Sequence, residues 1–159
     1  MTEEQIESCK RWVELETRGE AICRTHAQRT GNAAERAKWS LLAELENTTR
    51  NALVHYLREN GIGVIESAES RRSGELFAQQ SEGVAWLELM TAWRPRIVVY
   101  VDELRALASA ASASENALTA RLLEHEEAWL AFVDRELAGD AETSIEPVRA
   151  HLDKWRGRD

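Results

Sequence analysis

The chain has 159 residues, the usual size of one domain with its own core, so we expect a single domain over residues 1–159. Its 28 acidic residues outnumber its 20 basic ones, and a net charge of -8 repels phosphate backbones, so we do not expect nucleic-acid binding. No apolar run approaches the roughly 18 residues of a membrane span, and the N-terminus is acidic, so we expect a cytoplasmic protein that does not enter a membrane.

Two long helices are expected in the first 60 residues. The first begins at Thr2, because Thr2 and Gln5 have the spacing of a capping box, and it ends at the Thr30-Gly31-Asn32 break. The second runs from about Ala33 to Asn60, where Asn60-Gly61 is a helix stop signal. Residues 61–74 lack a helical period and are expected to form a connection.

Two more long helices and a short one are expected in the rest of the chain. The third starts near Gly74 and reaches about Ala108, with a kink at Pro95, which removes one backbone hydrogen bond. The fourth is opened by a capping box at Ser112 and lasts to about Ala138. A short C-terminal helix follows, which Ser144 caps and which holds Pro147 in its first turn.

Four long helices predict an all-α protein, most naturally a four-helix bundle. The connection over residues 61–74 could extend to roughly 40 Å, the length of a helix of about 27 residues. It could therefore act as a long crossover between helices two and three and make them parallel. In this layout residues 2–138 resemble the ferritin-like superfamily, whose bundles have one long crossover and often hold a di-metal carboxylate site.

Several polar residues fall on the apolar faces of these helices at 100° per residue. A buried carboxylate costs several kcal/mol unless it is paired, protonated or bound to metal, so each needs a partner. The inward-facing polar residues are Glu16 and Glu20 on the first helix, Glu46 on the second, Gln80 on the third, and His125, Glu126 and Glu136 on the fourth.

The resemblance implies a metal site built from these residues. The family pattern takes a Glu from each of two helices and a Glu-x-x-His from each of the other two. Neither glutamate of the second helix has a His three residues later, because Asn47 and Thr49 stand there, so the implied site is one ion or an irregular pair of iron, manganese or zinc. The implied ligands are Glu16 or Glu20, Glu46 or Glu44, and His125 with Glu126.

Two functions remain open from the sequence. The first is a ferritin-like protein with a carboxylate- and histidine-lined interior that binds metal, with or without redox chemistry. The second is a non-catalytic helical interaction or dimerisation module, in which the same glutamates form ion pairs with basic residues such as Lys38. Six Trp residues and broad apolar helix faces favour a homodimer in this second case.

Overall fold

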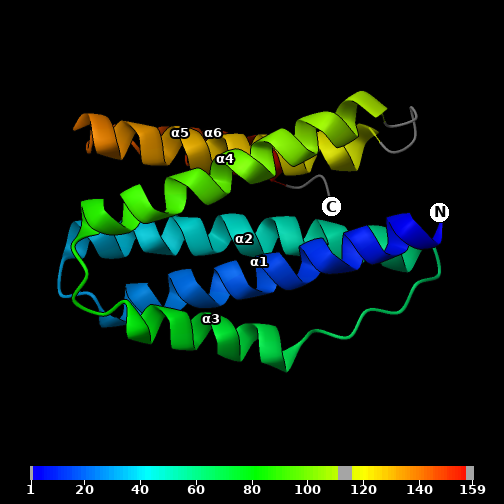
Figure 1. Ribbon diagram of the computed structural model, residues 1–159, viewed down its shortest axis with the longest axis horizontal. Helices are drawn as coiled ribbons and strands as arrows, with labels where there is room; N and C mark the ends of the chain where they lie inside the picture. Colours follow the sequence, from blue (N-terminus) through cyan, green and yellow to red (C-terminus); the bar gives the residue numbers. More distant parts are fainter. Residues whose placement is uncertain (1, 111–115, 157–159) are drawn as a thin grey trace. The chain divides into compact units, whose positions relative to one another are not determined.

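The computed structural model describes residues 2–110 and 116–156, which contain six α-helices and no strand (Figure 1). The all-α prediction is confirmed. The chain divides after Glu82 into two compact units, with α1, α2 and α3 in the first and α4, α5 and α6 in the second. Within the described ranges, every helix is too short or too polar to cross a membrane. The prediction of a single domain stays a prediction.

The first unit begins with two long helices, α1 (Glu3–Arg29) and α2 (Ala33–Glu59). The capping box at the start of α1 is complete, because the Gln5 amide donates to the Thr2 hydroxyl at 3.2 Å and the Thr2 amide donates to the Gln5 side chain at 2.6 Å. Asn32 caps α2 through its side-chain oxygen. Both predicted helices are therefore confirmed almost to the residue.

These two helices run antiparallel, side by side (Figure 1). Apolar residues three and four positions apart place one stripe of each helix in the interface. The imidazole of His26 stacks on the indole of Trp39, with ring centroids 4.5 Å apart. The larger apolar side chains buried in this hairpin are Trp12, Val13, Trp39, Leu42, Leu45, Leu53, Val54 and Leu57.

Helix α3 (Ala68–Gln80) lies where the sequence predicted the end of a connection and the start of helix three. The prediction of a connection up to residue 74 is wrong, because the Ser67 side chain accepts from the Ser70 amide and caps a helix there. Only residues 60–67 therefore lie between the end of α2 and the start of α3. Helix α3 runs parallel to the C-terminal half of α1 and packs on it (Figure 1).

A glycine permits this close packing of α3 on α1. A Cβ atom added to Gly74 would lie 2.9 Å from the Cβ of Ala21 and closer still to the carbonyl oxygen of Arg18. Near the end of the same interface, the Ser81 hydroxyl and a ring nitrogen of His26 are 3.3 Å apart. The absence of a side chain at residue 74 therefore sets how near the two helices approach.

The second unit begins with α4 (Trp86–Ala110), which packs along α5 (Asn116–Ala138). The predicted third helix is divided, because residues 81–85 form a turn in which Gly83 has φ +82°. Helix α4 continues through Pro95 without a break, so the predicted kink is not confirmed. Its core contacts with α5 include the edge-to-face pair Trp93 and Trp129, with ring centroids 5.8 Å apart.

The last helix, α6 (Glu146–Trp155), packs antiparallel on α5 and confirms the predicted short C-terminal helix. Its first turn contains Pro147, as expected. Ser144 does not cap it, because the Ser144 hydroxyl donates instead to the carboxylate of Glu136. The predicted capping box at Ser112 and Glu115 lies outside the described residues.

Candidate functional site

The three predicted acidic ligands of the first unit are all buried. Glu16, Glu20 and Glu46 expose only 1%, 3% and 7% of their surfaces. Helical periodicity alone therefore placed these carboxylates correctly inside the molecule. Because a buried carboxylate needs a compensating charge, the identity of that charge separates a metal ligand from a structural ion pair.

Glu20 forms ion pairs with two arginines. Arg50 of α2 donates to one of its carboxylate oxygens at 2.5 Å, and Arg24, one turn along α1, donates to the other at 2.6 Å. Arg50 is itself buried, so this pair is screened little by water. Glu20 thus has basic partners of the kind that the second interpretation of the sequence expects, although the sequence suggested Lys38 and the structure provides two arginines.

Glu46 lies against the backbone of α1. A Cβ added to Gly19 would lie 2.6 Å from the carboxylate carbon of Glu46, so this glycine makes the space that the carboxylate occupies. Burial raises the pKa of the nearby Cys23 thiol well above its usual range, and the charges of Glu46 and Glu20 raise it further. Cys23 is therefore a protonated, unreactive thiol at neutral pH.

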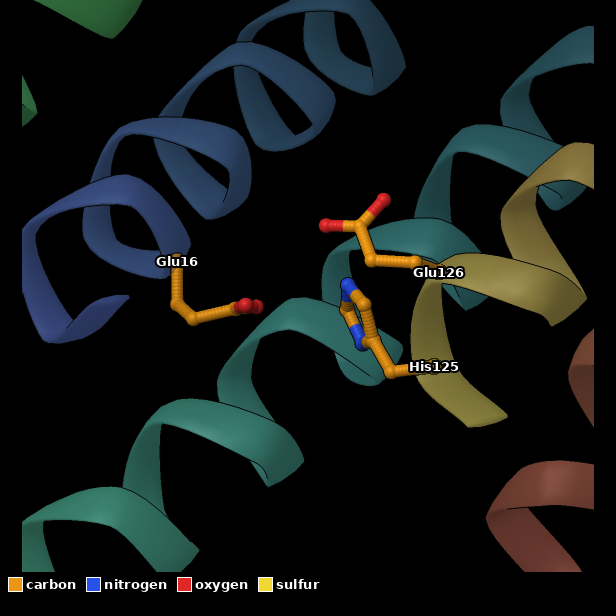
Figure 2. Close-up of side chains that lie close together, drawn as sticks. All are labelled: Glu16, His125 and Glu126. Atoms are coloured by element: carbon orange, nitrogen blue, oxygen red, sulfur yellow. The ribbon is translucent and has the colours of Figure 1, made fainter. Parts of the chain in front are cut away.

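The two predicted ligands of the second unit are adjacent on α5. His125 and Glu126 expose 1% and 6% of their surfaces. Figure 2 shows that both side chains project from the same side of α5, and it also shows Glu16 projecting from α1. A ring nitrogen of His125 and a carboxylate oxygen of Glu126 lie within 4.8 Å of each other. Two atoms that bind one ion at about 2.1 Å are separated by roughly 3–4 Å, so a small side-chain movement suffices.

His125 is held in the neutral form that binds metals. Burial lowers its pKa to about 3, and the positive charges of His151, when protonated, and Arg121 lower it further. At neutral pH no proton therefore competes for the imidazole lone pair.

A second buried imidazole, His151 on α6, was missed by the sequence reasoning. Its ring centroid is 6.2 Å from that of His125, and the residue exposes 5% of its surface. Within residues 2–110 and 116–156, its Nε2 atom has no hydrogen-bond partner. The signal was present, because His151 lies on the same face of its helix as Val148, Leu152 and Trp155.

Charged side chains of both α5 and α6 surround His151. Burial lowers its pKa to about 4, and this shift is opposed by Glu124 and reinforced by Arg121 and Lys154. Glu124 accepts from Lys154 at 2.7 Å and from the Trp155 indole at 3.1 Å, which ties α6 to α5 beside the two histidines.

Glu136 has a structural role in the same unit. Its carboxylate accepts a hydrogen bond from the Trp86 indole at 2.7 Å and another from the Ser144 hydroxyl. These bonds connect the start of α4, the end of α5 and the turn before α6. A buried carboxylate with two such donors is satisfied without a metal ion.

No family model, curated protein or solved structure matches the chain. The assignment of function therefore depends on the chemistry of these side chains.

Proposed function

We propose that this chain is a helical metal-binding protein and that His125 and Glu126 are two of its ligands. The observation that supports the proposal most is the pair itself: a fully buried neutral imidazole and a buried carboxylate, with ligand atoms within 4.8 Å, on one side of α5. An imidazole nitrogen and a carboxylate oxygen this close together are two of the donor types that bind divalent transition metals in protein interiors.

The donor set indicates which ions are suitable. An imidazole nitrogen with a carboxylate oxygen suits divalent iron, manganese or zinc, whereas magnesium and calcium prefer oxygen donors alone. Such an ion would act as a Lewis acid toward a small molecule that takes an open coordination position. We include redox or oxygen chemistry of the ferritin-like kind in this proposal.

The remaining predictions from the sequence stand with this proposal. They are the four-helix bundle with a kink at Pro95, the ferritin-like ancestry and the cytoplasmic location. Glu16 and Glu46 belong to the first unit and are not part of the proposed ligand set. Glu20 is left out of the proposed ligand set, because two arginines already occupy its carboxylate oxygens.

The experiment is a calorimetric titration of chelator-treated protein with Zn(II), Mn(II) and, without oxygen, Fe(II). Two variants remove the proposed ligands, His125→Gln and Glu126→Gln. Each has a matched control: His55→Gln changes an exposed histidine, and Glu127→Gln changes the next residue on α5, whose carboxylate is held by Arg105.

We expect one ion to bind the wild-type protein and both controls with similar affinity. The two ligand variants should bind at least about 100-fold more weakly, because even residues that only orient ligands change affinity by about 10- to 100-fold. Equal binding by all five proteins would refute the proposal, as would no binding to a folded wild-type protein.

A non-catalytic helical module is the second candidate function. The ion pair of Glu20 with Arg50 and the bonded carboxylate of Glu136 favour it, because they account for buried acids without any ligand. Its dimeric form is tested by sedimentation at micromolar concentration, where a homodimer is expected and a monomer would contradict it.

A further inference from the structure

The second unit contains an imidazole with no assigned role. His151 is more than nine-tenths buried, and its Nε2 atom has no hydrogen-bond partner among the described residues. A buried nitrogen without a partner has lost its hydrogen bond to water, and a metal ion bound to its lone pair would compensate that loss. Two aromatic rings lie beside it: that of His125, at 6.2 Å between centroids, and that of Trp155, at 6.4 Å.

We propose that His151 is the second imidazole ligand of the metal site, so that one divalent ion of the zinc and iron class binds His125, His151 and Glu126. This inference rests on the proposed function. It adds a ligand from a second helix, and it therefore makes the last helix, α6, part of the site.

The ring separation is compatible with one shared ion. With metal–nitrogen bonds of roughly 2.1 Å, two imidazoles bound to one ion have ring centroids on the order of 5–6 Å apart. The observed 6.2 Å is slightly above this range, and the two rings are inclined at 80°. The donor atoms of His125, His151 and Glu126 are not all within 4.8 Å of one another in this arrangement, so binding of one ion requires the His151 ring to turn about its side-chain bonds.

The chemistry of this donor set is selective. Two imidazoles and one carboxylate with open positions are typical of catalytic zinc sites and of non-haem Fe(II) sites, and they disfavour magnesium and calcium. Arg121 and Lys154 place positive charge near the two rings, and the carboxylates of Glu124 and Glu126 offset it. Because these charges offset one another, a dipositive ion at this site would not meet a large excess of positive charge from the surrounding side chains.

Helix α6 has contacts that would hold His151 in position. The Lys154 ammonium and the Trp155 indole both donate to Glu124, one residue before His125 on α5. The guanidinium of Arg121 lies over the Trp155 ring at 4.8 Å. These contacts fix the register of α6 on α5 independently of any metal ion.

The experiment is X-ray absorption spectroscopy of the Zn(II)-loaded full chain, which counts imidazole ligands. It is combined with Zn(II) affinity for His151→Gln and for the control His26→Gln, which changes another buried histidine that lies in the first unit. We expect two imidazoles in the wild-type protein and in the control. His151→Gln should show one imidazole and bind Zn(II) about 100-fold more weakly.

The outcomes separate the two proposals. If the wild-type protein binds Zn(II) through one imidazole and His151→Gln binds it equally well, this inference is overturned and the proposed function remains. If the folded wild-type protein binds no Zn(II), Mn(II) or Fe(II), both are overturned. If His151→Gln does not fold, the imidazole count of the wild-type protein still decides the question.

Discussion

Gly74 provides the sharpest test of the packing in the first unit. Replacing it by alanine would place a Cβ 2.9 Å from the Cβ of Ala21 and nearer to the Arg18 carbonyl oxygen. That oxygen belongs to the backbone of α1 and cannot rotate away, so α3 must move outward. The Ser81 and Phe77 side chains, which contact His26 and Arg18, would move with it.

Two opposing effects set the magnitude of this change. Alanine is favoured over glycine inside a helix by about 0.5–1 kcal/mol, which would stabilise the variant. Overpacking a tight interface costs about 1–3 kcal/mol. The clash is with backbone, so we expect the second effect to win and the free energy of unfolding to fall by about 1–2 kcal/mol.

Urea unfolding followed by far-UV circular dichroism measures this difference, with Ser73→Ala as the matched control. Ser73 is the exposed neighbour of Gly74 on α3, and its replacement changes only helix propensity. We expect the control to be as stable as the wild-type protein or slightly more stable. A Gly74→Ala variant that is stabilised to the same degree as Ser73→Ala would refute the close approach of α3 to α1.

Three further predictions follow from the buried charges. Glu20→Ala should lower the free energy of unfolding by about 3 kcal/mol, because it leaves Arg50 buried without the Glu20 carboxylate. The double variant Glu20→Met, Arg50→Met should recover most of this loss in the same urea assay. A Glu20→Ala variant as stable as the wild type would contradict the ion pair. Metal-free protein should lose stability as the pH falls from 7 to 5, because His125 and His151 bind protons at their ordinary pKa when unfolded but only near pH 3 and pH 4 when folded. Each histidine should lower the free energy of unfolding by roughly 1 kcal/mol per pH unit. His151→Gln should show a shallower pH dependence, and an unchanged slope would contradict the assignment of this dependence to the histidines. Glu136→Ala should cost about 2 kcal/mol and alter Trp86 fluorescence, because the indole loses its acceptor, and unchanged emission would contradict that bond.

Helices with strong ends and large apolar stripes could be predicted from the sequence. The capping box at Thr2, the Asn60-Gly61 stop and the stop at Gly139 placed the ends of three long helices within a few residues. Helix α3 could not be found this way, because its buried positions are Gly74 and Ala78. Residues this small leave no hydrophobic period, and their contribution is close approach to α1 rather than apolar area.

The sequence predicts which polar side chains of the candidate site are buried, but it does not predict which side chains they contact. Periodicity placed Glu16, Glu20 and His125 inward, and all three are buried. The partner of Glu20 could not be deduced. Periodicity gives the side of a helix on which a residue lies, but it does not give the direction in which a long side chain such as that of Arg50 extends. His151 could not be predicted from the pattern of the four long helices, because it lies on the short helix α6.

If His125 belongs to a metal site, the metal content of protein purified without an affinity tag should differ between the wild type and His125→Gln. We expect near-stoichiometric iron, manganese or zinc in the wild-type protein and its loss in a folded variant. Equal metal content in the two proteins, or none in the wild type even after anaerobic addition of Fe(II), would contradict this expectation.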